Sequence, residues 1–289
     1  MTLAEAVIYG EKMLRDAGIA EASLDAWYLL EHVMGISRAM YFADSRVKLE
    51  EKQEKAYQSC IERRAARIPL QHITGVQEFM GLEFQVNEHV LIPRQDTECL
   101  VEEALLFLKP GMRVLDMCTG SGCILISLLK LCEQQNPVMW KEVPTVGVGV
   151  DISADALEIA RNNGKRLQTD VLWKLGDLFQ AVEGEAAFDL IVSNPPYIRT
   201  EVIAGLEEEV RLYDPWLALD GKEDGLYFYR RMTEECGRCL KKGGRLLFEI
   251  GHDQAEAVTE LMEKQGFQEI YVKKDLAGLD RVVSGVYNN

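Results

Sequence analysis

Apolar residues near the start of the chain recur at three- and four-residue intervals. The segments LAEAVIYGEKMLRDAG, SLDAWYLLEHVMG and LEEKQEKAYQSCIERRAAR all have this spacing, which gives a helix one apolar face. Thr2 is placed to cap the first helix. Gly18 and Gly35 follow the first two segments as helix-ending glycines, and the third segment stops before Pro69. We therefore expect a small helical domain over residues 1–70.

Beyond this region the pattern changes twice. Residues 71–92 alternate between apolar and polar positions and contain Gly75 and Gly81, which predicts a β-hairpin connector. From residue 93 onward, the apolar runs MRVLDM, TVGVGVD, VLWKLGD, FDLIVSN and GRLLFEIG alternate with helical segments such as ILISLLKLC and ADALEIARNNG. This alternation predicts an α/β domain over residues 93–289, with a mostly parallel sheet covered by helices on both faces.

Two parts of this domain break the alternation. The last apolar runs, within QEIYVKKDLAGLDRVVSGVY, are separated only by the turn-prone Ala277-Gly278. We therefore expect an antiparallel pair of strands at one end of the sheet. Residues 133–144 have no clear pattern and are expected to form a surface loop.

Composition narrows the class of protein. Of the 289 residues, 47% are hydrophobic and 27% are charged, as in ordinary globular proteins. No apolar run has the length of a membrane span, and the N-terminus lacks the features of a secretory signal, so a cytoplasmic protein without membrane contact is expected. The net charge of −15 disfavours binding of nucleic acid through its phosphates and favours a basic protein partner.

The seven cysteines form no regular framework, as expected for reduced thiols. Cys236 and Cys239 have the spacing of half a zinc site, but no second pair of cysteines or histidines stands at ligand spacing. We therefore expect no metal.

A glycine-rich loop follows the first strand of the predicted sheet. The stretch VLDMCTGSGCILISLL has the order strand, loop, helix, which brings a ligand against main-chain amides at a helix N-terminus. Gly120 and Gly122 permit a close approach of the backbone. Because the loop lacks the third glycine of the dinucleotide-binding motif, a tight turn without a ligand is an open alternative.

Acidic residues end the next two strands. Asp151 follows VGVGV and can accept hydrogen bonds from both hydroxyls of a ribose, with Ile152 as an apolar flank for an adenine ring. Asp177 and Leu178 follow the third strand, where Asp177 can accept from an exocyclic amine. A solvated loop aspartate is the alternative at that position. All these residues lie at the carboxyl ends of predicted parallel strands, where such sheets bind ligands.

The fourth strand stops on two prolines, in IVSNPPYI. Proline has a fixed φ and no N–H, so the pair ends the ladder. The Asn194 side-chain oxygen and the Pro195 carbonyl are then able to accept hydrogen bonds from one NH2 group. Tyr197 can pack against the plane of a bound amide. A rigid strand-to-loop turn and a purely structural tyrosine are the alternatives.

An adenosine-bearing cofactor beside such a turn is better interpreted as S-adenosylmethionine than as a dinucleotide. Charge that develops on an amide nitrogen during methyl transfer strengthens both hydrogen bonds, so the turn favours the transition state over bound substrate. No strong base is then required. His72, His89 and His252 are expected to be surface or core residues.

Several motifs in a fixed order give the chain a specific resemblance. They are RIPLQHITG, VLIPR with Asp96-Thr97-Glu98, DMCTGSG, VDIS, NPPYI, DPWLAL, DGLYFYR, EIG and DLAGLDR. In these motifs the chain resembles the HemK/PrmC family of protein glutamine methyltransferases. That family methylates the glutamine in the Gly-Gly-Gln motif of peptide chain release factors.

The resemblance implies a Rossmann-like, seven-stranded class I methyltransferase domain and a helical domain that recognises the release factor. It implies S-adenosyl-L-methionine as cofactor and S-adenosyl-L-homocysteine as product. Together with the positions at strand ends, the resemblance gives the expected cofactor-binding residues: Cys118, Thr119, Gly120, Ser121, Gly122, Asp151, Ile152, Asp177, Leu178 and Asn194. The expected substrate-binding residues are Pro93, Arg94, Glu98, Asn194, Pro195, Pro196 and Tyr197, and the expected catalytic residues are Asn194, Pro195 and Tyr197.

The chain departs from the family pattern at two loop positions, Gln95 and Cys118, and Leu178 is a further position at which relatives can differ. Gln95 replaces a proline, Cys118 stands where glycine is frequent, and Leu178 stands where an aromatic residue can occur. For Arg94 and Glu98, a salt-bridged structural role is the alternative to shaping the mouth of the pocket.

Two other functions compete with this interpretation. An amino-methyltransferase acting on adenine or cytosine in nucleic acid also presents a planar NH2 group to such a turn, but the acidic balance and the lack of a basic recognition segment disfavour it. A cofactor-binding regulator without activity would not need both the carboxylate and the amide pocket residues. We therefore expect a monomeric enzyme whose partner is a release factor.

Overall fold

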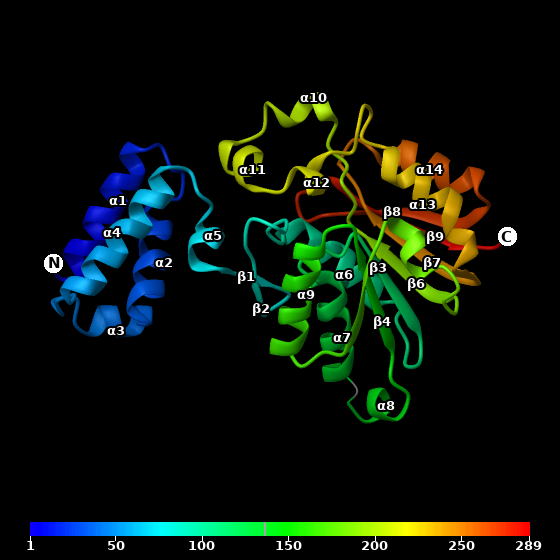
Figure 1. Cartoon of the computed structure of the whole chain (residues 1–289), viewed down its shortest axis with the longest axis horizontal. Helices are drawn as coiled ribbons and strands as arrows, with labels where there is room; N and C mark the ends of the chain where they lie inside the picture. The colour runs from blue at the N-terminus through cyan, green and yellow to red at the C-terminus, as the bar shows by residue number, and fades with distance from the viewer. Residues whose placement is uncertain (136) are drawn as a thin grey trace. The chain divides into compact units, whose positions relative to one another are not determined.

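The structure is a computed structural model that describes residues 1–135 and 137–289. These residues form two compact units (Figure 1). One unit comprises Met1–Val76 together with Glu207–Tyr213, and the other comprises Gln77–Leu206 and Asp214–Asn289. A segment from the second half of the chain therefore completes the unit at the N-terminus.

The first unit is helical, as the apolar spacing predicts. Its N-terminal part contains α1 (Leu3–Asp16), α2 (Ala22–Met34), α3 (Arg38–Ala43), α4 (Glu51–Ala65) and α5 (Leu70–Thr74). Thr2 caps α1 in a capping box with Glu5, and Gly35 ends α2 with a φ of 63°, the left-handed conformation that glycine adopts readily. Leu14, Leu29 and Tyr57 are fully buried among the helices. The two short helices, α3 and α5, were not predicted because five or six residues do not establish a period.

Helix α11 (Glu208–Tyr213) is the downstream segment that belongs to this unit. Arg64 and Arg67 each donate a hydrogen bond from Nη1 to Glu209 Oε1 at 3.2 Å. The Tyr213 hydroxyl donates to the Ala66 carbonyl at 3.0 Å. Arg64 also donates from Nε to the buried Asp25 at 2.7 Å, so the same guanidinium connects α2, α4 and α11.

The second unit contains a seven-stranded sheet in the order β5-β4-β3-β6-β7-β9-β8. Its strands are β3 (Arg113–Met117), β4 (Val146–Asp151), β5 (Val171–Leu175), β6 (Phe188–Ser193), β7 (Leu240–Glu249), β8 (Phe267–Lys274) and β9 (Asp280–Tyr287). The five strands from β5 to β7 pair in parallel, and β9 pairs antiparallel with both β7 and β8. This confirms the predicted α/β fold, its mostly parallel sheet and the antiparallel pair at one end.

Helices and short turns connect these strands. They are α6 (Glu98–Leu105), α7 (Cys123–Gln135), α8 (Pro137–Glu142), α9 (Ala154–Arg166), α10 (Thr200–Ile203), α12 (Trp216–Leu219), α13 (Tyr227–Glu235), α14 (Ala255–Lys264) and the 3-10 turns η1 (Gln95–Thr97), η2 (Leu178–Val182) and η3 (Cys236–Arg238). A short hairpin of β1 (Val76–Phe79) and β2 (Leu82–Gln85) lies within the predicted connector.

The expected surface loop at residues 133–144 is wrong for most of its length. Helix α7 continues to Gln135, and α8 occupies Pro137–Glu142. Pro137 suits the first position of a helix because its φ is already near the helical value. Asn136 lies outside the described residues.

The side chains of the sheet alternate between two apolar cores. Leu115, Ile191 and Phe248 belong to the core beneath α13 and α14, whereas Val114 and Val192 belong to the core beneath α6 and α7. This alternation follows from the two-residue period of a strand. Both faces of the sheet are thus buried, as expected for parallel strands.

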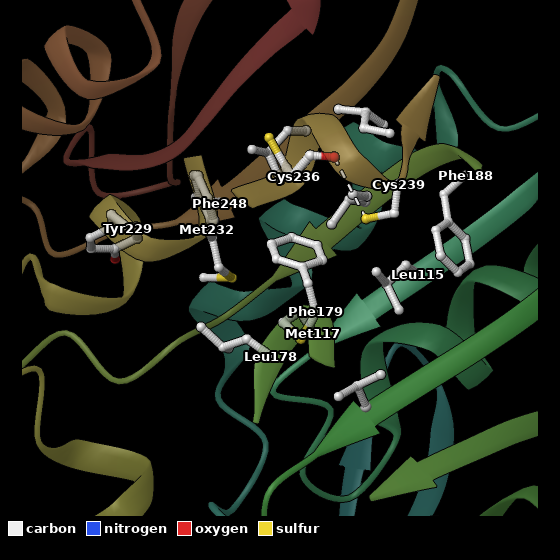
Figure 2. Close-up of a cluster of buried hydrophobic side chains, with 14 of the residues drawn as sticks. Leu115, Met117, Leu178, Phe179, Phe188, Tyr229, Met232, Cys236, Cys239 and Phe248 are labelled. Carbon is white, nitrogen blue, oxygen red and sulfur yellow. Dashed lines mark hydrogen bonds between the residues drawn. The ribbon is translucent and has the colours of Figure 1, made fainter. Parts of the chain in front are cut away.

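Cys236 and Cys239 lie in the first of these cores. Figure 2 shows them among Leu115, Phe179 and Met232, with a dashed hydrogen bond from Cys239 Sγ to the Cys236 carbonyl, which measures 3.6 Å. All seven cysteines are described, and each is a free thiol. The pair therefore acts as a small buried apolar group.

Within the part of the chain that the structure covers, none of the helices combines the length and apolar character that crossing a membrane requires.

Candidate active site

A cavity of about 340 Å³ opens at the carboxyl ends of β3, β4, β5 and β6. Most of the predicted site residues line it: Pro93, Arg94, Cys118, Thr119, Gly120, Ser121, Asp151, Ile152, Asp177, Leu178, Asn194 and Pro196. Glu98, Gly122, Pro195 and Tyr197 are not part of the lining. Residues on four neighbouring strand ends thus meet at one cavity, where open α/β sheets bind ligands.

The loop between β3 and α7 has a left-handed backbone at Cys118, Gly120 and Gly122, with φ values of 61°, 54° and 79°. The two glycines serve different purposes. A Cβ at Gly120 would meet nothing within 4 Å, whereas one at Gly122 would lie 2.7 Å from Trp173 Cη2. The lack of a side chain at Gly120 therefore leaves that part of the cavity open. The lack of one at Gly122 permits close packing of Trp173 beneath the loop. Cys118 has a positive φ. Glycine adopts such a φ without the steric cost of a Cβ, which explains why glycine suits this position.

Asp116 lies beneath this loop and is fully buried. Thr119 donates a hydrogen bond from its hydroxyl to Asp116 Oδ2 at 2.5 Å. Burial raises the pKa of Asp116 to about 7, and the nearby Asp151 adds to the rise. Sequence reasoning did not select Asp116, because an acidic residue inside an apolar strand gives no sign of which residues surround it.

Asp151 ends β4 with both carboxylate oxygens held in place. Oδ2 accepts from the Gly120 main-chain N–H at 2.8 Å, and Oδ1 accepts from the Ser153 N–H at 2.9 Å. Burial raises the pKa of Asp151, and these main-chain donors partly offset the rise. Each oxygen retains a further lone pair for a donor in the cavity. Ile152 follows with 58% of its surface exposed and forms an apolar part of the wall.

Asp177 is paired with a cation. Arg231 of α13, which also lines the cavity, donates from Nη1 to both Asp177 oxygens, at 2.9 and 3.1 Å. The pairing raises the pKa of Arg231. Sequence reasoning missed Arg231 because its spacing within DGLYFYRR marks only an exposed helix position. Leu178 is buried and has a φ of 49°, so the chain turns sharply between the ion pair and the core.

Asn194 follows directly after β6, and its amide has a definite orientation. Its Nδ2 donates to Thr97 Oγ1 at 3.2 Å. The preceding Ser193 is fully buried, and its hydroxyl donates to the Met117 carbonyl at 2.6 Å. Among residues 1–135 and 137–289, no group donates a hydrogen bond to the Pro195 carbonyl oxygen. An amide oxygen and a main-chain oxygen are therefore both able to accept.

The chain beyond the two prolines is held from the other side. Ile198 donates from its N–H to the Leu219 carbonyl at 3.0 Å and accepts from the Gly221 N–H at 2.8 Å. Gln254 donates from Nε2 to the Tyr197 carbonyl at 3.0 Å. These bonds keep the turn rigid independently of any ligand.

Tyr197 points toward a buried carboxyl group. Its hydroxyl donates to Glu249 Oε1 at 3.4 Å. Glu249 is the last residue of β7, and burial raises its pKa to about 7, while the Thr97 hydroxyl and Arg281 act to lower it. Burial also raises the pKa of Tyr197. Thr97 and Glu249 both lie within motifs of the family resemblance, but the sequence alone predicted no role for either residue.

The mouth of the cavity is organised by ion pairing. Arg94 Nη2 donates to the buried Asp214 at 2.5 Å while the arginine lines the cavity. Glu98 instead accepts from the Met80 main-chain N–H at 2.7 Å. Arg94 thus lines the cavity while it is paired with Asp214. Glu98 instead stabilises the turn of the β1–β2 hairpin.

Comparisons with known proteins agree on one kind of chemistry. The model of the PrmC N-terminal domain matches residues 5–75, and a methyltransferase domain model matches residues 108–280. A release factor glutamine methyltransferase from Caulobacter vibrioides is 41% identical over 293 residues, covering 100% of this chain and 97% of that protein. One from Geobacter sulfurreducens is 40% identical over 272 residues, covering 94% of this chain and 92% of that protein.

Among solved structures, a methyltransferase from Pyrococcus furiosus superposes with a TM-score of 0.52. It is 19% identical in sequence, and the match covers 79% of this chain and all of that one. At this level of identity the similarity concerns the fold.

Proposed function

The chain belongs to the release factor glutamine methyltransferases, and on that basis we propose what it does at the cavity. It transfers a methyl group from S-adenosyl-L-methionine to the side-chain amide nitrogen of a glutamine. The substrate is the glutamine of the Gly-Gly-Gln motif in peptide chain release factors. The observation that carries this proposal is the orientation of Asn194, whose Nδ2 is bonded to Thr97 while the residue lines the cavity.

The chemistry of the residues that line the cavity suits S-adenosyl-L-methionine. A nucleoside needs an acceptor for its ribose hydroxyls and an apolar slot for its base. Asp151 supplies an immobilised carboxylate, while Ile152 and Leu178 supply apolar walls. When bound, the cofactor supplies an electrophilic methyl group on a sulfonium sulfur.

The residues at the end of β6 orient the substrate nitrogen. A carboxamide nitrogen is a weak nucleophile because its lone pair is delocalised into the carbonyl. Asn194 Oδ1 and the Pro195 carbonyl accept its two N–H bonds, which holds the nitrogen in one direction. Positive charge that grows on the nitrogen strengthens these bonds, and alignment of two reactants lowers a barrier by about 7–11 kcal/mol in favourable cases.

The helical unit provides the surface for the protein substrate. We assign recognition of the release factor to residues 1–70, the connector to residues 71–92 and catalysis to residues 93–289. The match of residues 5–75 to the PrmC N-terminal domain supports this division. The net charge of −15 favours a basic partner surface.

The proposal is tested by incubating the chain with isotopically labelled S-adenosyl-L-methionine and a release factor. Peptide mass spectrometry should place one labelled methyl group on the Gly-Gly-Gln glutamine, and a release factor with alanine at that position should stay unlabelled. Parallel reactions contain DNA or RNA. Label on adenine or cytosine without label on the glutamine would overturn the proposal in favour of a nucleic-acid amino-methyltransferase.

An Asn194→Ala variant separates catalysis from cofactor binding. We expect kcat to fall by about 10²–10³-fold, the loss typical when one oriented hydrogen-bonding group is removed from a transition state. The dissociation constant of S-adenosyl-L-methionine, measured by calorimetry, should change only a few-fold. Asn162→Ala, at an exposed position of α9, is the matched control. Normal methylation by the Asn194 variant would contradict the assignment.

A further inference from the structure

We propose that Thr97 is a positioning residue that sets which end of the Asn194 amide faces the substrate, and that Glu249 in turn sets the orientation of the Thr97 hydroxyl. This inference rests on the proposed function for its meaning in catalysis. The arrangement itself is a chain of three side chains, Asn194 to Thr97 to Glu249, drawn from segments far apart in the sequence.

The first link is the hydrogen bond between Asn194 and Thr97. An asparagine amide has a donating end and an accepting end of nearly equal shape, so packing alone does not decide its orientation. Thr97 Oγ1 accepts from Asn194 Nδ2 at 3.2 Å. With the donating end occupied, the accepting Oδ1 is directed elsewhere. An amide turned the other way would present a donor to a substrate NH2 group and repel it.

The second link explains why the Thr97 hydroxyl accepts. A hydroxyl both donates and accepts, and its rotation decides which it offers to a neighbour. Thr97 is 2% exposed, so no bulk water competes for its proton. The Thr97 hydroxyl acts to lower the pKa of the nearby Glu249 carboxyl, and a carboxyl group that is ionised can only accept hydrogen bonds. The hydroxyl proton then lies toward Glu249, and a lone pair lies toward Asn194.

The third feature is the isolation of Glu249. The residue is 2% exposed, its Oε1 accepts a hydrogen bond from the Tyr197 hydroxyl, and its Oε2 accepts none from the residues that the structure describes. A buried carboxyl with so few partners costs free energy. Its neighbours Arg281, at the start of β9, and Asp96 are ion-paired with each other at 3.2 Å. The orientation of neighbouring hydroxyl groups explains why a carboxyl group occupies this buried position.

The test compares Thr97→Val with Thr97→Ser. Valine keeps the shape of threonine but removes the acceptor, and serine keeps the hydroxyl. We expect kcat for the release factor to fall by roughly 10- to 100-fold in Thr97→Val, with little change in the KM for S-adenosyl-L-methionine, and to recover most of its value in Thr97→Ser. Thr145→Val, remote from the cavity, is the matched control. A Thr97→Val enzyme with wild-type kcat would overturn the inference.

A second measurement decides the inference without reference to activity. The side-chain NH2 resonances of Asn194 in NMR spectra report the bond to Thr97. We expect these protons to be protected from exchange with water in wild type and in Thr97→Ser, and to lose protection in Thr97→Val while the thermal midpoint changes little. Unchanged protection in Thr97→Val would refute the orienting bond. A wild-type chain that fails to methylate glutamine would instead refute the proposed function, and this measurement would still decide the role of Thr97.

Discussion

Single residues at the cavity derive their chemistry from hydrogen bonds that immobilise them. Asp151 was predicted from its place at a strand end, and the structure adds that two main-chain N–H groups hold its carboxylate. Asn194 was predicted in the same way. The partners Thr97, Arg231 and Glu249 were not predicted. Thr97 and Asn194, for example, are separated by 97 positions in the sequence, and no local pattern reports a contact over that distance.

Replacing Asp151 with asparagine tests its double role. Asparagine offers only one oxygen, so its NH2 end must face one of the two main-chain donors, and the carboxylate charge is lost. We expect the dissociation constant of S-adenosyl-L-methionine to rise by about 10- to 100-fold, since hydrogen bonds to a charged group contribute about 1.5–3 kcal/mol. Calorimetric titration measures the change. Asp155→Asn, at an exposed position in the first turn of α9, should bind normally, and equal affinities for both variants would contradict the assignment.

At the scale of elements, predictability follows length. Buried strands and long helices are recognisable from the periodicity of their apolar positions and from their apolar content. The sheet and the helices α1, α2, α7 and α9 were therefore predicted. The short helices α3, α5 and α8 were not. Their five or six residues do not complete enough turns to establish a period. The conformation of these short helices depends instead on neighbouring segments of the same chain. The cavity lies at strand ends, which explains why its main residues were predictable while its loop partners were not.

The loop between β3 and α7 offers a matched pair of glycine substitutions. Gly120→Ala introduces only an alanine with positive φ, a strain of about 1–2 kcal/mol. Gly122→Ala adds a Cβ that would lie 2.7 Å from Trp173 and 3.1 Å from Ile126, and overpacking of this kind costs about 1–3 kcal/mol more. Denaturant unfolding should therefore show a larger loss of unfolding free energy for Gly122→Ala. Equal losses of unfolding free energy would mean that Trp173 moves aside without an energetic penalty, and would contradict this prediction.

At the scale of the whole molecule, the helical unit contains a segment that the sequence pattern does not connect with it. The predicted helical domain ends near residue 70 and has no gap, but the helical unit of the structure also includes Glu207–Tyr213. The six residues of α11 resemble any polar surface helix. Their attachment depends on Arg64, Arg67 and Ala66, which no local pattern connects with them.

Two adjacent glutamates test this attachment. Glu209 accepts from two arginines and is 22% exposed at its side chain, whereas Glu208 lies 3.8 Å from Arg67 alone and is 57% exposed. We expect Glu209→Gln to weaken the docking of α11 by about 1–2 kcal/mol and Glu208→Gln by less than about 0.5 kcal/mol. Hydrogen exchange of the main-chain amides in residues 208–213 measures both. Equal protection in the two variants would show that the shared carboxylate does not hold the helix.

The attachment of α11 also bears on how the protein is made. Arg64 and Glu209 are 145 residues apart, so a ribosome exposes α4 long before it has synthesised the carboxylate that α4 binds. The N-terminal helices therefore emerge first but acquire their last helix only after four of the five parallel strands have been translated. Maturation of the two units is interleaved, in contrast to domains that complete their folding one after another during translation.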